Sequence, residues 1–158
     1  MKKVFLVMVF LVSAFYTTVH ADPGKGSAKS SKAEYVERLV KSSFKKRFPQ
    51  AQFDIWQQVD GADLYLVRFL YNDEGMIAYI DTDGSVVATV RNVLRENLPI
   101  TINHELVSQY GNYKVKEVLE MVLHEDLNYL VRVESDKNRI TVRIHSNGES
   151  TQVRKEKL

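Results

Sequence analysis

The feature that most constrains this chain is an internal repeat with a fixed offset of 64 residues. The word YLVR at Tyr65–Arg68 returns at Tyr129–Arg132. At the same offset, and without a gap, a turn sequence ending at Gly84 aligns with one ending at Gly148. A shared word with a shared spacing to a turn glycine indicates two copies of one structural unit. A unit of about 60 residues buries little surface alone, so we expect the copies to fold together.

Each copy is predicted to begin with a helix. In the first copy, apolar residues recur every four positions, which places them on one side of a helix. Pro49 ends this pattern, because proline disfavours helix in the preceding residue and lacks an N–H. Pro99 marks the start of the second helix, where its missing N–H is harmless. The apolar positions of the first helix are Val36, Val40, Phe44 and Phe48.

After each helix the apolar period changes to two, which indicates strands separated by short turns. Closely spaced strands with turn-forming residues between them favour an antiparallel meander. Turns are expected at residues 60–63, 72–75 and 124–126. The strands are expected at residues 52–59, 64–71, 76–81 and 86–90, and then, after a second helix over 100–109, at 114–123, 129–135, 139–145 and 150–154.

The sequence therefore predicts an α+β fold. It is a tandem repeat of helix-plus-four-strand units, at residues 32–97 and 98–158, that form one continuous antiparallel sheet with both helices on one face. Joining the units edge to edge would remove one exposed sheet edge from each and pool their cores.

The first 21 residues resemble an export signal. Two lysines precede an apolar run from Val4 to Tyr16, and a more polar segment ends in a small residue, Ala21. The run is too short to cross a hydrocarbon core of about 30 Å as a helix, although a retained membrane anchor is the competing interpretation. We expect a periplasmic or secreted protein, with residues 22–31 as a flexible leader to the folded part.

Export changes the charge of the chain. The full sequence has a net charge of +2, and removal of the two leader lysines brings it to zero. We therefore expect no general affinity for nucleic acid, and none for a membrane after cleavage. Between Lys25 and Arg47, however, eight basic residues stand against Glu34 and Glu37. This segment is interpreted as a solvated tail and helix face, with a docking site for an acidic surface as the alternative.

Alternation along the strands predicts which residues face away from the helices. In the second copy this open face carries charged side chains such as Arg132 and Arg143, which are costly to bury unpaired. In the first copy the same face is apolar and aromatic, which is typical of an interaction surface. Cover by the N-terminal tail or by a second copy in a homodimer is the competing explanation. The predicted partner-binding residues are Trp56, Leu66, Arg68, Leu70, Ile77 and Tyr79. For Trp56 the alternative is a β-bulge that would turn its side chain inward.

A search for catalytic or metal-binding motifs finds none that is complete. A zinc-protease helix needs a second histidine one turn after His104, but Ser108 occupies that place, and the sequence at His124 fails likewise. Asp81–Gly84 has only part of a calcium loop and is better explained as a hairpin turn. The absence of cysteine excludes disulfides and thiolate sites. The prediction is a protein that is not an enzyme and needs no cofactor or metal.

The order of these features resembles a known family. A signal peptide precedes a helix ending in Phe48-Pro49, the Trp56 strand, the segment 78–84 (AYIDTDG), and a second helix followed by residues 110–113 (YGNY). From about Ala33 onward the chain is similar to the small secreted bacterial proteins called beta-lactamase-inhibitor-like and PepSY-like. The resemblance implies a tandem fold whose concave sheet face binds a protein. PepSY domains are associated with the inhibition of peptidases. It implies no inhibitory residue.

Two functional hypotheses follow. The preferred one is an exported, non-enzymatic binding module that engages a protein or peptide, for example a peptidase, through the open sheet face. The alternative is a periplasmic carrier or sensor of a small ligand, with Arg68, Tyr79 and His145 as its contacts. A hydrolase that uses His104 or His124 is a distant third.

Overall fold

The computed structural model describes residues 30–158, so the expected signal peptide and most of the expected leader lie outside the described residues. The element order is one helix and four strands, followed by a short 3-10 turn, a second helix and four more strands. These elements are α2 (Ser30–Arg47), β1 (Gln52–Gln58), β2 (Leu64–Tyr71), β3 (Glu74–Asp81), β4 (Val86–Asn92), η2 (Arg95–Asn97), α3 (Ile100–Tyr110), β5 (Lys114–Leu123), β6 (Asp126–Glu134), β7 (Asn138–His145) and β8 (Ser150–Lys157).

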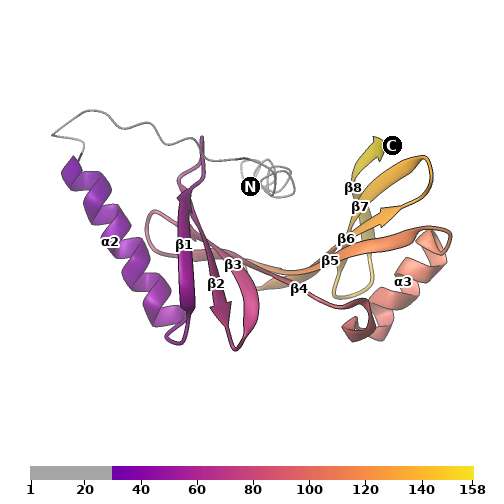
Figure 1. Ribbon diagram of the computed structural model, residues 1–158, viewed down its shortest axis with the longest axis horizontal. Helices are drawn as coiled ribbons and strands as arrows, with labels where there is room; N and C mark the ends of the chain where they lie inside the picture. The colour runs from indigo at the N-terminus through magenta and orange to yellow at the C-terminus, as the bar shows by residue number, and fades with distance from the viewer. Residues whose placement is uncertain (1–29) are drawn as a thin grey trace.

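The eight strands form one antiparallel sheet in the order of the chain, β1 to β8. The expected continuous sheet is thereby confirmed, since β4 of the first half pairs directly with β5 of the second. The sheet is strongly bent, and its two ends rise on the same side (Figure 1). We call that side the concave face and the other side the convex face.

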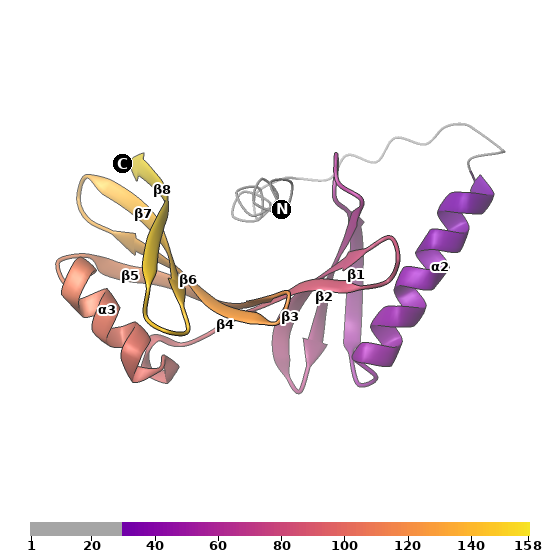
Figure 2. The same cartoon turned by 180° about the vertical axis from the view of Figure 1, so that it is seen from behind.

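Both helices lie on the convex face, one at each end of the sheet (Figures 1 and 2). The register supports this placement. Ala78, which lies beneath α2, pairs with Thr89 of β4, and Thr89 pairs in turn with Val122 of β5. Val122 pairs with Leu127, which lies beneath α3. A row of paired residues shares one face of a sheet, so the two helices cover the same side. The expectation of helices on one face is confirmed.

Each helix buries its own core against its half of the sheet. The core under α2 contains Val40, Phe44, Phe48, Val67, Phe69, Ala78 and Ile80. The core under α3 contains Leu98, Ile102, Leu106, Val118, Tyr129, Val131, Val133, Ile140, Val142 and Ile144. The alternate strand positions predicted to face the helices do so.

The sequence places most elements within two or three residues. β2 and β5 have the predicted bounds, whereas β6 begins three residues earlier and β8 ends three residues later than expected. The expected turn over 72–75 is wrong in length, because only Asn72 and Asp73 form it, with φ values of 51° and 63°. His124 and Glu125 make a similar two-residue turn, with φ values of 47° and 72°. Two consecutive positive φ values match the twist of a hairpin and allow the strands to run to its ends.

Candidate functional site on the concave face

The pairing of the strands aligns the predicted partner-binding residues in two rows on the concave face. In one row Ile55 lies opposite Arg68, which lies opposite Ile77 and then Val90. In the other, Leu66 lies opposite Tyr79 and then Ala88. Five of the six predicted residues, all except Trp56, therefore share the face opposite the helices.

The middle of the concave face is an apolar cluster that spans both halves of the sheet. Met121 is fully buried and the other members are at most 7% exposed. We call this set the central cluster; it consists of Leu66, Tyr79, Ala88, Val90, Leu119, Met121 and Leu130. Partly buried neighbours, including Val59 on the first half and Val153 from β8, pack against it. Since β8 is the far edge of the sheet, this contact shows how strongly the sheet curls.

The expectation that the whole apolar face is open is therefore wrong for Leu66 and Tyr79, which are 2% and 6% exposed. The accessible part lies towards β1. There Ile55 and Leu70 are 64% and 37% exposed, and Arg68 and Ile77 are half-buried. We call these four residues, Ile55, Arg68, Leu70 and Ile77, the apolar edge.

Trp56 does not belong to this face, and its prediction as a partner-binding residue is corrected. It lies opposite Val67, a core residue, and its ring packs edge-on against Phe44 of α2 at a centroid distance of 5.1 Å. A β-bulge between Gln52 and Ile55, with Phe53 at a φ of 55°, shifts the register of β1. One extra residue turns every later side chain to the other face. Ile55 takes the concave position instead, and the sequence reasoning missed it.

Burial dominates the electrostatics of Tyr79. Loss of water around the phenol raises the pKa of Tyr79 to about 12, although the nearby Arg68 guanidinium acts in the opposite direction. The phenol is therefore neutral at physiological pH and contributes to the central cluster mainly as an apolar ring.

On the second half, the concave face is polar and internally paired. Arg132 forms an ion pair with Glu117 at 3.0 Å, and Glu134 pairs with Arg139 and, at 3.5 Å, with Lys116. The Arg139 contact is the largest cause of a lowered pKa at Glu134. These side chains help to line a cavity of about 660 Å³ beside the connector at residues 92–95.

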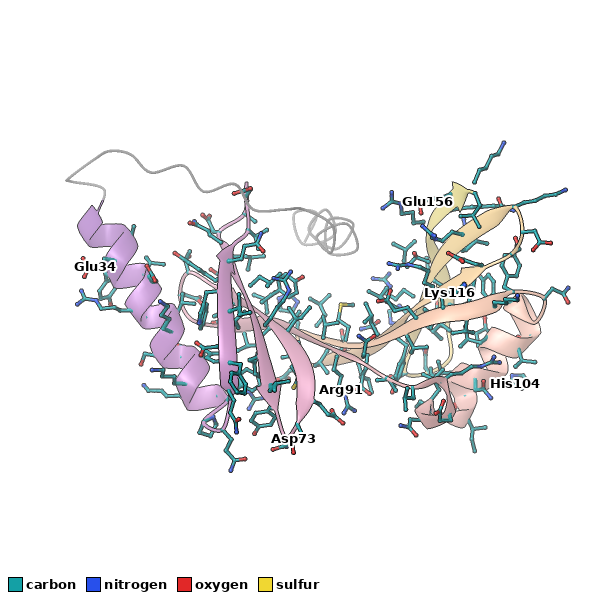
Figure 3. All side chains as sticks on the ribbon, viewed as in Figure 1. Glu34, Asp73, Arg91, His104, Lys116 and Glu156 are labelled. Carbon is teal, nitrogen blue, oxygen red and sulfur yellow. The ribbon has the colours of Figure 1, made fainter. Side chains whose placement is uncertain are left out.

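The three histidines of the described residues lie on separate elements. His104 lies on α3 at the outer side of the molecule (Figure 3), His124 is in the β5–β6 turn, and His145 ends β7. Within residues 30–158, no group of three or more histidine, aspartate or glutamate side chains could hold a metal ion. No helix in this range is long and apolar enough to cross a membrane.

Comparison with known proteins identifies the fold but not a family. No protein-family model matches the chain, and no curated protein matches it. Among solved structures, it is similar to a DUF2874 family protein of Bacteroides ovatus, with 22% identity over 75% of this chain and 85% of that one and a TM-score of 0.66. A BLIP-like protein of Bacteroides fragilis shares 18% identity over 77% and 85% of the chains, with a TM-score of 0.64.

A candidate periplasmic protein of Bacteroides eggerthii is also similar, with 16% identity over 75% of this chain and 86% of that one and a TM-score of 0.66. At these identities the likeness concerns the fold alone. The chain has a BLIP-like fold, in which residues 30–158 form a single eight-stranded antiparallel sheet with two helices. This part of the predicted resemblance is confirmed.

Proposed function

We propose that this chain is an exported, non-enzymatic binding module that engages a protein or peptide through its concave face. The observation that carries the proposal is the apolar edge, in which exposed Ile55 and Leu70 adjoin Arg68 and Ile77. Apolar side chains around an arginine are typical of binding hot spots. The buried central cluster beneath them holds the strands in place, so a partner would meet a preformed surface and lose little free energy to ordering.

The location and the domain division belong to the same proposal. The export signal over residues 1–21, the leader over 22–31, and the candidate periplasmic protein of the same fold all favour the cell envelope or the medium. Residues 32–97 and 98–158 are proposed as two copies of one unit. Matched glycines favour this division, because Gly84 and Gly148 have φ values of 88° and 91°, and a Cβ at either position would collide with a side chain of the helix in its own half. The PepSY-like part of the resemblance stays a prediction, and it favours a peptidase as the partner.

The alternative function is a carrier or sensor of a small ligand, and the cavity beside residues 92–95 is what favours it. Its volume of about 660 Å³ lies within the range of ligand pockets. The charged groups that line it already pair with one another, so a ligand would have to displace Arg132 from Glu117 or Arg139 from Glu134. Arg68, Tyr79 and His145, the predicted ligand contacts, do not line this cavity. Binding of a protein is therefore the better-supported function.

Photo-crosslinking in exporting cells tests the proposed surface. A crosslinkable residue is placed at Ile55 or Leu70, and in matched controls at Ile100 or Val107, which are exposed apolar residues of α3 at 89% and 53%. A protein captured at the first two positions only is identified by mass spectrometry and purified. Its affinity is then measured for the wild type, for the Ile55→Asp/Leu70→Asp variant and for the Ile100→Asp/Val107→Asp control.

We expect the first variant to weaken binding by about 10- to 100-fold, as loss of one or two hot-spot residues does, and the control to bind as the wild type does. Equal affinities for both variants would exclude the apolar edge as the site. Substitutions at Leu66 and Tyr79 are unsuitable because a charge there would disrupt buried packing. Native mass spectrometry of the wild type discriminates the alternative, since a stoichiometric small ligand would favour a carrier.

A further inference from the structure

The exported chain is expected to have a net charge near zero, but its positive and negative charges are unevenly distributed along the molecule. Residues 30–47, which form α2, contain six basic and two acidic residues, a net charge of +4. Residues 48–158 contain 12 basic and 17 acidic residues, a net charge of −5. The positive charge is thus concentrated on a single helix at one end of the sheet (Figure 2).

The basic residues of α2 form a stripe on the side that faces away from the sheet. Val40 and Phe44 point into the core, with 0% and 2% of their surface exposed. The opposite positions follow the spacing i, i+3, i+4, i+7 and i+8, which places them on one helix face. We call this face the basic stripe; it consists of Arg38, Lys41, Ser42, Lys45 and Lys46, which together line a shallow hollow of about 440 Å³.

Most charges of the stripe have no role in holding the fold together. Lys41 pairs with Glu37 at 2.7 Å on the same helix. In the described part of the chain, no carboxylate forms an ion pair with Arg38, Lys45 or Lys46. The second half differs, because Arg132 and Arg154 each pair with a glutamate. Unpaired like charges repel one another, so their clustering on α2 costs stability that a binding role would explain.

An exposed aromatic residue accompanies the stripe. Tyr35 is 60% exposed, and it precedes Arg38 by three positions and Ser42 by seven, so it lies on the same helix face. Tyrosine next to basic side chains is typical of surfaces that meet the headgroup region of a membrane, where its ring is apolar and its hydroxyl is hydrated. The apolar side of α2 is occupied by the core, so the helix can lie on a bilayer but cannot insert into it.

The expectation of no membrane affinity after cleavage rests on net charge alone, and the position of the charges leads to a different conclusion. We propose that the basic stripe and Tyr35 dock the protein on a bilayer surface that carries anionic phospholipid headgroups. Such a surface presents charge over a plane, which matches a straight, exposed row of cations better than a point contact would. A second copy of the chain is a poorer partner, because glutamates such as Glu74, Glu117 and Glu134 are already in ion pairs. The attraction would orient the molecule with α2 towards the membrane and its acidic remainder away from it.

Vesicle flotation tests the proposal with the full-length chain. The vesicles contain phosphatidylcholine alone or phosphatidylcholine mixed with phosphatidylglycerol. The stripe variant is Arg38→Gln/Lys45→Gln/Lys46→Gln, and its control removes the same charge elsewhere as Lys137→Gln/Lys155→Gln/Lys157→Gln, three exposed lysines of the second half. Every variant carries the same N-terminal residues, so a difference between variants is due to the substituted side chains. Far-UV circular dichroism verifies that each variant is folded.

Each basic residue near an anionic surface raises the partition coefficient about fivefold at low ionic strength. The stripe variant lacks three such residues, so its partition coefficient on anionic vesicles should be about 100-fold lower than that of the wild type. The control should retain most of the wild-type binding. Salt at about 1 M, where the Debye length is about 3 Å, should release the wild type from the anionic vesicles. Tyr35→Ser should cause a smaller loss that persists as salt is raised.

Three results would overturn the proposal. The first is equal loss of binding by the stripe variant and the control, since net charge alone would then explain the attraction. The second is equal partitioning of the wild type into neutral and anionic vesicles. The third is self-association in analytical ultracentrifugation that disappears in the stripe variant while no variant binds anionic vesicles, which would assign the stripe to a second copy. The apolar edge is a different surface, so none of these results bears on the proposed partner site.

Discussion

The two halves of this molecule share a topology but fill their cores with different chemistry. Beneath α2 the core is aromatic, with the ring of Phe44 at centroid distances of 5.4 Å from Phe48, 5.1 Å from Trp56 and 4.9 Å from Phe69. Beneath α3 the core is mainly aliphatic, and Tyr110 and Tyr113 make a ring pair at its margin. The fold therefore requires apolar side chains at given positions, without requiring particular residues.

The contrast is greater on the surfaces that the fold does not bury. The outer face of α2 is basic, whereas the outer face of α3 exposes Ile100 and Val107. On the concave face, the first half offers the apolar edge and the second half offers ion pairs. Positions free of packing constraints differ most between the halves, and both proposed binding surfaces lie on the first half. On these two proposals, the second half would serve mainly to extend and support the sheet.

The largest expected effect tests whether the two halves unfold as one unit. Phe44→Ala should lower the free energy of unfolding by about 3–5 kcal/mol and Ile102→Ala by about 2–5 kcal/mol, because each removes a buried helix side chain and leaves a cavity. Because β4 pairs with β5, both changes should shift Trp56 fluorescence and far-UV circular dichroism together during urea unfolding.

The exposed α3 residue Val107, changed to alanine, is the control and should alter stability by less than about 0.5 kcal/mol. Trp56 is the sole tryptophan and lies in the first half. An unchanged Trp56 midpoint in the Ile102→Ala variant would show that the halves unfold separately, and the description of one cooperative sheet would be wrong.

The second-largest expected effect is the loss of stability when either of the matched turn glycines, Gly84 or Gly148, is replaced by alanine. A Cβ at Gly84 would collide with the Ser43 side chain of α2, and one at Gly148 would lie 2.8 Å from Thr101 Cγ2 of α3. Both glycines have positive φ, which costs another residue about 1–2 kcal/mol. With overpacking added, Gly84→Ala should destabilise by about 2–4 kcal/mol and Gly148→Ala by somewhat less.

Gly61 supplies the control for this comparison. It also has positive φ, but a Cβ there would meet nothing within 4 Å. In thermal or urea unfolding, Gly61→Ala should therefore lower the free energy of unfolding by only about 1–2 kcal/mol, the cost of a positive φ at a residue other than glycine. If Gly148→Ala costs no more than Gly61→Ala, the turn of the second half does not support α3 as the turn of the first half supports α2.

Most of the fold could be predicted from local sequence because burial and turns leave periodic signals. Alternation located all eight strands and placed Leu66, Arg68, Leu70, Ile77 and Tyr79 on one face. Trp56 could not be placed, because the bulge that reverses its direction occurs at Phe53, without the glycine that often marks such a site. The turn expected over 124–126 is present, but its positive φ values at His124 and Glu125 could not be predicted, because neither residue type is among those that such turns favour.

The accessibility of the concave face also escaped prediction, for a different reason. Alternation decides on which side of a strand Leu66 and Tyr79 lie, but burial depends on the bend of the whole sheet. That bend brings Val153 of β8 against a cluster centred on β3 to β6. β4 extends past Val90 because Arg91 and Asn92 pair with β5 in the ladder, and pairing with a strand so distant in the sequence leaves no periodic pattern in β4 itself.

Alkaline pH should cause a smaller loss of stability, through buried tyrosines that occur in both halves. Tyr79 in the first half has a pKa raised to about 12 by burial, and burial also raises the pKa of Tyr129 in the second. The folded state holds the Tyr79 proton more tightly than the unfolded state does. This contribution of about 2–3 kcal/mol is therefore complete below pH ~10 and is lost as pH rises from about 10 to about 12.

Unfolding free energies measured across this range should fall more steeply for the wild type than for Tyr79→Phe, which has no phenol to ionise. Absorbance at 295 nm should show the late titration of one tyrosine, absent from the variant. If the two proteins lose stability in parallel between pH 10 and 12, burial at Tyr79 is not the source of the alkaline sensitivity.

The smallest effect concerns the contact between the halves on the convex face. Arg91 lies beneath the middle of the sheet, between the two helices (Figure 3). It donates to Glu120 at 2.7 Å and to Glu74 at 2.8 Å, and the Tyr129 hydroxyl donates to Glu120 at 3.3 Å. Neither helix covers this region, so a charged network closes the gap between two apolar cores.

Arg91→Met keeps the stem of the side chain but removes both ion pairs, and it should cost about 1 kcal/mol in urea unfolding. Arg154→Met is the control, because it removes a single ion pair, with Glu156, that lies within the edge strand β8 and does not join the halves; it should cost less than about 0.5 kcal/mol. The two values should converge at high salt, which weakens the more exposed Arg91–Glu74 pair first. Equal costs at low salt would mean that the halves are joined by the β4–β5 backbone hydrogen bonds and central cluster alone.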